Sequence, residues 1–331
     1  MTESTLFEVR KTESQSRLDG LRTELTTKIS AGGGPNNNPD ICIFASGSLA
    51  RLEASAHSDL DAFFFLTGNK RDTPLSRIAD VKILNAIIDS AQASGFPDFS
   101  NDGEYLQFMH IQDVIDGIGG REDDYQNAFT ARMLLILESK YIYNEKLFRQ
   151  FRFDVIERYF KDFHKHANDF KPIFILNDVL RFWRTLCLNY ENGRHWRNAS
   201  DTRERAKGHL SNLKLRFSRL SICFSFVALL LKNNGSVFPE KMIEICDMTP
   251  IERLNSLASI RNIQIDIEGA LFEYEWFLDA LAYPKDEVLD WIGDKTKRTE
   301  AFAHSDKFVS AMFSVVRKIA EDNGYLRYLV I

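Results

Sequence analysis

The spacing of apolar residues along the first third of the chain predicts helices and short strands in alternation. Leu18, Leu21 and Leu25 recur at helical spacing, which predicts a helix over residues 13–30. Short apolar runs bounded by turn residues are typical of buried strands. The elements predicted after this helix are a strand at 41–45, a short helix at 49–56, a strand at 59–66, a helix at 75–94 and a strand at 105–111.

From about residue 121 onward, the pattern changes to long segments with helical spacing only. Ile173, Leu176, Leu180 and Trp183 follow the 3, 4, 3 spacing of one buried helix face. The segments predicted to be helical are 125–139, 144–166, 172–192, 200–232, 249–281, 285–294 and 298–322. The sequence therefore predicts an α+β protein, with a small mixed-sheet domain at 1–120 followed by a larger all-helical domain at 121–331.

Composition narrows the function classes only slightly. The chain has 331 residues and a formal net charge of -5, which argues against a protein that mainly coats nucleic acid. Its 4 cysteines form no Cys-x-x-Cys pair, so a zinc site or a disulfide framework is not expected. The N-terminus lacks an apolar signal-peptide core, and the most apolar run, Leu220–Leu231, is too short to span a bilayer. We expect a cytoplasmic protein without a membrane partner.

The clearest candidate for a ligand-binding turn is Ser46-Gly47-Ser48. These residues end a predicted strand, and a short helix is predicted to follow. A glycine allows the backbone to approach a ligand closely, and the start of a helix favours an anion. We therefore expect Gly47 and Ser48 to hold phosphate.

A pair of acids follows this turn, at Asp59 and Asp61. Alternation along a strand places both carboxylates on one face and Leu60 on the other. Two neighbouring carboxylates repel each other, and a cation between them relieves the repulsion. Carboxylates without His or Cys suit Mg²⁺, with Mn²⁺ as the alternative. A triphosphate on the Gly-Ser turn would complete the metal shell, as in-line displacement at phosphorus requires.

This combination resembles the nucleotidyltransferase motif of the DNA polymerase β superfamily. It is most similar to the branch that contains the PII-protein uridylyltransferases and their uncharacterised bacterial relatives. The resemblance is carried by Gly47-Ser48-Leu49-Ala50-Arg51-Leu52-Glu53 and by Ser58-Asp59-Leu60-Asp61. It implies that Asp59 and Asp61 are catalytic and hold the metal. The nucleotide-binding residues that it implies in this part of the chain are Gly47, Ser48, Arg51 and Ser58.

The same resemblance implies a third carboxylate on the next strand, where it helps to activate the acceptor hydroxyl. The stretch Asn101-Asp102-Gly103-Glu104-Tyr105 offers two candidates. Glu104 lies at the predicted start of the strand and is preferred as the third catalytic residue, while Asp102 stays open.

The predicted helix over 200–232 also carries a polar line. The line follows spacings of 4, 3, 4, 3 and 4 and comprises Lys207, Ser211, Lys214, Ser218, Ser221 and Ser225. In this superfamily a helix after the catalytic domain often supplies Lys and Ser to the triphosphate, and the resemblance makes Lys214 and Ser218 nucleotide ligands. The alternative is a solvated helix face.

The sequence thus predicts a magnesium-dependent enzyme that transfers NMP from an NTP such as ATP to an acceptor and releases pyrophosphate. The acceptor stays open between a protein side chain, an RNA 3′ end, a second nucleotide and a small molecule, and the acidic charge counts against a large RNA. One alternative is a non-catalytic nucleotide-binding regulatory module. A less favoured alternative is an RNase in the helical half, because Arg203 and His209 fit the loose Arg-x(4–6)-His pattern of HEPN ribonucleases.

Overall fold

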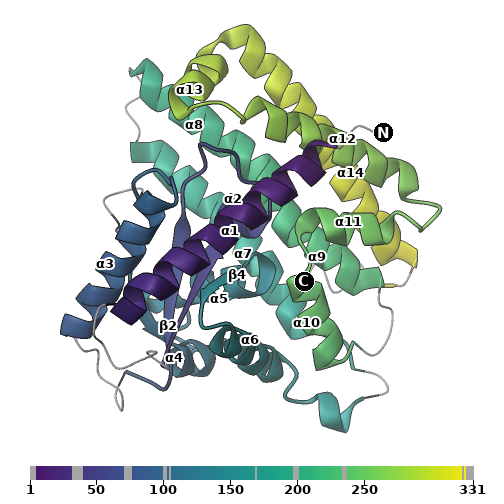
Figure 1. The fold of residues 1–331 in the computed structure, drawn as a ribbon. Helices are drawn as coiled ribbons and strands as arrows, with labels where there is room; N and C mark the ends of the chain where they lie inside the picture. The colour runs from purple at the N-terminus through teal and green to yellow at the C-terminus, as the bar shows by residue number, and fades with distance from the viewer. Residues whose placement is uncertain are drawn as a thin grey trace. The chain divides into compact units, whose positions relative to one another are not determined.

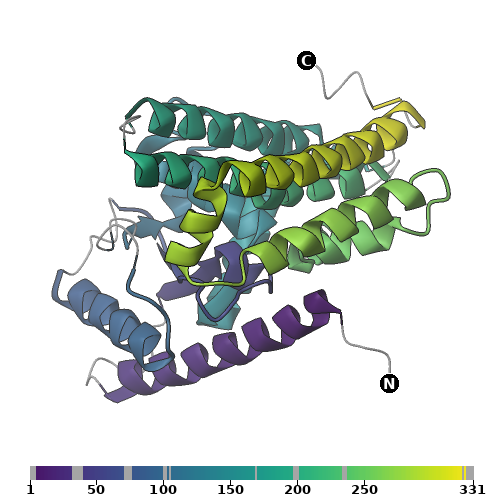
Figure 2. The same ribbon diagram turned by 90° about the horizontal axis from the view of Figure 1, so that it is seen from above.

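The computed structural model describes residues 5–31, 40–70, 77–99, 103, 106–167, 170–196, 201–232, 237–322 and 324–325. The chain divides into two compact units, Met1–Arg158 and Tyr159–Ile331. A mixed sheet with helices forms the first unit, and helices alone form the second, which confirms the predicted α+β class (Figures 1 and 2).

The first unit contains a four-stranded sheet with strand order β3-β2-β1-β4. Strand β1 is antiparallel to β2 and β4, and β2 is parallel to β3. The elements of this unit are α1 (Leu6–Ala31), β1 (Ile41–Ser46), α2 (Gly47–Ala50), β2 (Asp61–Leu66), α3 (Arg77–Ala93), β3 (Phe108–His110), α4 (Ile111–Asp116), the 3-10 helix η2 (Tyr125–Asn127), α5 (Ala128–Leu137), β4 (Lys140–Tyr143) and α6 (Glu145–Tyr159).

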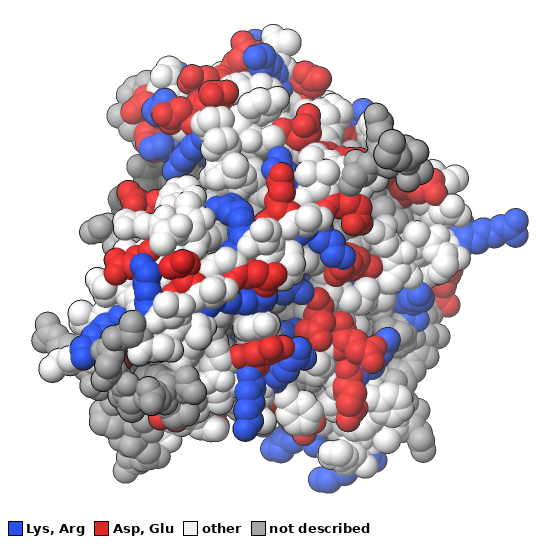
Figure 3. All heavy atoms as spheres, in the orientation of Figure 1, with Lys and Arg blue, Asp and Glu red and all other residues white. Residues whose placement is uncertain are grey.

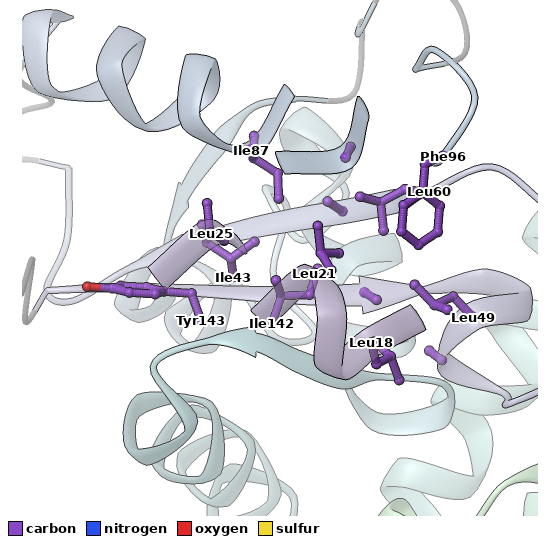
Figure 4. Close-up of a cluster of buried hydrophobic side chains, with 14 of the residues drawn as sticks. Leu18, Leu21, Leu25, Ile43, Leu49, Leu60, Ile87, Phe96, Ile142 and Tyr143 are labelled. Carbon is purple, nitrogen blue, oxygen red and sulfur yellow. The ribbon is translucent and has the colours of Figure 1, made fainter. Parts of the chain in front are cut away.

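The two faces of the sheet are covered by different helices. On one face, Leu18, Leu21 and Leu25 of α1 belong to the same buried cluster as Ile43 and Ile87, so α1 and α3 cover this face (Figure 4). On the other face, the rings of Phe44 and Phe148 lie 6.2 Å apart, and those of Phe65 and Phe151 lie 6.5 Å apart. Successive residues of a strand point to opposite faces, so both faces of β1 and β2 are apolar.

The sequence predicts a domain boundary near residue 120, whereas the first compact unit extends to Arg158. The difference arises because β4, which the sequence analysis does not predict, pairs with β1 and completes the sheet. The aromatic side chains of α6 then cover its second face. The predicted helix at 49–56 is a single turn, α2, and β2 begins at Asp61 instead of Asp59.

The second unit is built around an aromatic core. Phe217 stacks on Phe277 at 4.5 Å and on Phe308 at 4.9 Å between ring centroids. No helix in the described part of the chain combines the length and the apolar character that a bilayer crossing requires. The elements of this unit are the 3-10 helix η3 (Phe163–Lys165), α7 (Ile173–Trp196), α8 (Thr202–Lys214), the π-helical turn η4 (Leu215–Arg219), α9 (Leu220–Lys232), α10 (Pro239–Asp247), α11 (Pro250–Leu257), α12 (Gln264–Ala280), α13 (Lys285–Gly293) and α14 (Lys295–Asp322).

The predicted helix over 200–232 is continuous, but the π turn η4 interrupts its regular spacing. A π turn closes hydrogen bonds from i to i+5, so it shifts the phase of every residue that follows. Lys207 and Lys214 before the shift are exposed, whereas Ser218 and Ser221 are buried. The prediction of one polar face along this helix is therefore wrong.

Candidate functional site

The Gly-Ser turn lies directly against the second acid of the Asp-x-Asp motif. Ser46, the last residue of β1, pairs with Asp61, the first residue of β2. Gly47 adopts a φ of +69°, and a Cβ atom built on it would lie 2.6 Å from Oδ2 of Asp61. A side chain at position 47 would meet both left-handed strain and a clash with the carboxylate. The fold thus brings together the two parts of the motif.

Asp59 and Asp61 are both exposed, while Leu60 between them is only 3 % exposed. The alternation predicted from the sequence is therefore present, although Asp59 precedes the strand. The donors that the pair offers are carboxylate oxygens, which fit Mg²⁺. Within the described ranges no group of three His, Cys, Asp or Glu side chains could hold a metal ion. Magnesium commonly keeps waters and substrate phosphate oxygens as its remaining ligands, so two carboxylates suffice for a phosphate-linked site.

Arg51 of the motif lies in a buried ion-pair network. Its Nε donates to Oε2 of Glu53 at 2.8 Å, and its Nη1 donates to Oε2 of Glu138. Ser46 Oγ donates to the other oxygen of Glu138 at 3.2 Å, and only 6 % of the Arg51 side chain is exposed. The network ties the end of β1 to the residues that follow α2. This geometry favours a positioning role for Arg51 over direct contact with phosphate.

Glu138 is a site component that the sequence analysis does not identify. It follows the apolar helix α5 and precedes β4, and it is 3 % exposed. A carboxylate directly after an apolar run such as Met133–Leu137 is an unusual position, because a buried acid needs a partner. The position of this acid after an apolar run is visible in the sequence, whereas its pairing with Arg51 is visible only in the fold.

The loop that leads to the acids is held by α1. Arg17 Nη1 donates to the carbonyl oxygen of Ser55 at 2.6 Å, and Arg17 Nη2 donates to that of Ser58 at 3.2 Å. The same guanidinium lies 4.0 Å from the ring centre of Phe96. Ser58 Oγ accepts the Ser55 N–H at 3.0 Å, so this predicted nucleotide ligand also closes its own turn. Leu52 in the loop has a φ of 59°, a strained value for a branched side chain.

The predicted third carboxylate, Glu104 or Asp102, lies outside the described residues. The described strand β3 is parallel to β2, with Phe108 opposite Phe64. Parallel strands begin at the same edge of a sheet. The chain therefore enters β3 from the same edge of the sheet at which β2 begins with Asp61.

Lys214 and Ser218 belong to the second unit, and their part in nucleotide binding stays a prediction. Lys214 ends α8 and is exposed, whereas Ser218 lies in the π turn and is 7 % exposed. Ser218 also accepts a hydrogen bond at its carbonyl oxygen from Ser221 Oγ at 2.8 Å. Arg203 and His209 both lie on α8, where Arg203 pairs with Asp286.

No protein-family model matches this chain, and no curated protein matches its sequence. The functional argument therefore depends on the geometry of the residues described above.

Proposed function

We propose that the first unit is the catalytic part of a magnesium-dependent nucleotidyltransferase. The observation that carries this proposal is the contact between the Gly47 turn and the Asp61 carboxylate, which leaves 2.6 Å between Oδ2 and the position of a Cβ on Gly47. A glycine at that point lets the Asp61 carboxylate, which can hold a cation, approach the backbone of a turn that is proposed to bind phosphate.

In this proposal the Gly47-Ser48 backbone and the Ser48 hydroxyl bind the triphosphate, and Asp59 and Asp61 hold Mg²⁺. When bound, Mg²⁺ neutralises phosphate charge and fixes the triphosphate for in-line attack. The buried Arg51–Glu53–Glu138 network and the Arg17 contacts keep the turn and the acids in register. Preorganisation of this kind is what positions a reacting phosphate without further rearrangement.

The proposed reaction is the transfer of NMP to an acceptor hydroxyl or phosphate oxygen. The acceptor oxygen forms a bond to the α-phosphorus, the bond from that phosphorus to the bridging oxygen breaks, and pyrophosphate leaves. The hydroxyl proton of the acceptor passes to a carboxylate, for which we propose Glu104, with Asp102 as the alternative. A protein, an RNA 3′ end, a second nucleotide and a small molecule all stay as candidate acceptors.

The test is incubation of the protein and Mg²⁺ with each NTP labelled at the α-phosphate, with candidate acceptors added one at a time. We expect label transfer and pyrophosphate release for at least one NTP, and loss of both in an Asp59→Asn/Asp61→Asn variant. Asp98→Asn, at another exposed acid of the same unit, is the matched control and keeps full activity.

Two outcomes would contradict the enzymatic proposal. Full turnover in a folded Asp59→Asn/Asp61→Asn protein would place the chemistry elsewhere. Tight magnesium-dependent NTP binding without turnover under every acceptor condition would favour the non-catalytic regulatory module.

A further inference from the structure

A second candidate site lies in the helical unit, where described residues of α8, α13 and the start of α14 line a cleft. In Figure 1, α8 and α13 lie side by side, in agreement with their packing contacts. The cleft has a volume of about 660 Å³. Pockets that hold small molecules commonly span about 300–1,000 Å³. It therefore has room for a ligand of nucleotide size.

The floor of this cleft is apolar and closely packed. Ala206 of α8 and Gly293 of α13 approach so closely that a Cβ on the glycine would lie 3.9 Å from the Cβ of Ala206. Leu289 of α13 also lines the cleft. Small residues at a helix crossing leave the depression that the longer side chains then surround.

Arginine side chains dominate the charged lining, with Arg203 and Arg205 from α8 and Arg298 from α14. Arg203 pairs with the exposed carboxylate of Asp286. Within the described ranges neither Arg205 nor Arg298 forms an ion pair with a carboxylate, and Arg298 Nη1 donates to the Gly293 carbonyl oxygen at 2.9 Å. Asp290 is the acid of the lining. Arg205 and Arg298 therefore line the cleft without a salt-bridged carboxylate, and the charge of Arg298 also acts on Asp294.

His209 lies among the same arginine side chains. Its imidazole lines the cleft, and its pKa is lowered from 6.5 by burial first and then by the charges of Arg298 and Arg205. His209, Arg205 and Arg298 all line the same cleft.

We propose that this cleft binds the phosphate group of a small phosphorylated molecule. Arg205 and Arg298 supply planar guanidinium donors, which match phosphate oxygens in bidentate pairs. The apolar floor of Ala206 and Leu289 accepts the organic part of the ligand, and Asp290 accepts its hydroxyl groups. The site is separate from the nucleotidyltransferase proposal, because the described residues that line it all belong to the second unit.

A small ligand is favoured over a nucleic acid by the distribution of charge. On the face seen in Figure 3, Lys and Arg side chains are interspersed with Asp and Glu, without a continuous basic track. Nucleic-acid binding relies on several phosphate contacts along such a track. The formal net charge of -5 points the same way.

The experiment measures binding by calorimetry in EDTA, with the full-length Asp59→Asn/Asp61→Asn protein, so that the first unit lacks its metal ligands. The probes are inorganic pyrophosphate, ATP and a 5′-phosphorylated oligoribonucleotide. We expect ATP or pyrophosphate to bind, and Arg205→Gln and Arg298→Gln each to weaken that binding by about tenfold to 100-fold. Arg317→Gln, the same change elsewhere on α14, is the matched control and leaves the affinity unchanged.

Each outcome decides the proposal. Tighter binding of ATP than of pyrophosphate would identify a nucleotide as the ligand. Equal binding of the two would show that the phosphate group alone is recognised. Both results support the proposed phosphate site. Absence of binding, binding that survives both arginine changes, or binding of the oligoribonucleotide alone would overturn it. Because Arg298 also contacts the Gly293 carbonyl, the exposed Arg205 provides the variant least coupled to folding. Absence of label transfer in the wild-type protein, together with intact binding at this cleft, would contradict only the proposed enzymatic function.

Discussion

At the scale of single residues, the backbone conformation of Gly47 and its neighbour Asp61 both exclude a side chain at position 47. Its φ is +69°, and a Cβ would lie 2.6 Å from Asp61 Oδ2. Left-handed backbone costs other residues about 1–2 kcal/mol. Gly47→Ala should therefore destabilise the first unit and also displace the Asp61 carboxylate. We expect NTP affinity, measured by calorimetry with a non-hydrolysable analogue, to fall by about tenfold or more.

Gly95 provides the matched control for this prediction. Its φ is +73°, but no atom lies within 4 Å of a Cβ built on it. Gly95→Ala should lower the melting temperature by a similar amount through backbone strain alone, without any effect on NTP affinity. Equal affinity losses in the two variants would show that the effect reflects stability and not the phosphate turn.

His209 gives a prediction on pH at the same scale. Burial, Arg298 and Arg205 lower its pKa from 6.5, so the unfolded chain takes up the proton first as the pH falls. The free energy of unfolding should therefore decrease as the pH falls below 6.5, because the unfolded state binds more protons there. Titration of the His209 ring signal by NMR should give a pKa below 6.5 for the imidazole.

Arg298→Gln should raise the pKa of His209 only part of the way toward 6.5, because burial is the largest cause of its lowered pKa. Arg317→Gln should leave it unchanged. A wild-type value at or above 6.5 would contradict the environment described for the imidazole.

At the scale of secondary-structure elements, the Arg51 network connects β1, the residues after α2 and the end of α5. Arg51→Leu would remove the cation that pairs with the buried carboxylates of Glu53 and Glu138. Removal of one partner of a buried ion pair typically costs about 3–5 kcal/mol. We expect a loss of that size in urea unfolding. Glu138→Gln retains an acceptor for Ser46 Oγ and relieves one charge, so it should cost less.

The exposed pair of Arg149 and Glu145 on α6 serves as the comparison, with side chains that are 66 % and 42 % exposed. Arg149→Leu should change the free energy of unfolding by about 0.5 kcal/mol or less, since solvent screens such pairs. A similarly small effect of Arg51→Leu would contradict the positioning role of the network.

The elements that could be predicted from the sequence are those with a long or purely apolar pattern. Apolar periodicity locates α3, α7 and α13 closely, and the run that forms β1 is recognisable because both of its faces are buried. Strand β4 was missed because its Lys140-Tyr-Ile-Tyr143 sequence is short and only partly buried. The proximity of Gly47 and Asp61 could be predicted, because the two residues belong to neighbouring parts of one sequence motif. The Arg51–Glu138 contact could not, because the two residues are 87 positions apart and meet only in the tertiary fold.

At the scale of the whole molecule, the two units offer opposite chemistry. The first unit presents exposed carboxylates beside a glycine turn, which suit a cation and its phosphate. The second presents arginines around an apolar floor, which suit an anion directly. The two proposals therefore concern different chemistry in different units, and variants in each unit test them separately.

The last prediction concerns Lys214, which the resemblance to nucleotidyltransferases makes a ligand of the triphosphate. Lys214 is exposed at the end of α8, just before the π turn, a type of irregularity that frequently occurs at functional sites. A charge-assisted bond to phosphate contributes about 1.5–3 kcal/mol, or about a tenfold to 150-fold change in affinity. Lys214→Ala should therefore weaken magnesium-dependent NTP binding by that factor and leave NMP binding nearly unchanged. Lys232→Ala, at the end of α9, is the control and should change neither affinity. Equal losses for NTP and NMP would indicate a damaged fold, and no loss for either would show that Lys214 is not a ligand of the triphosphate.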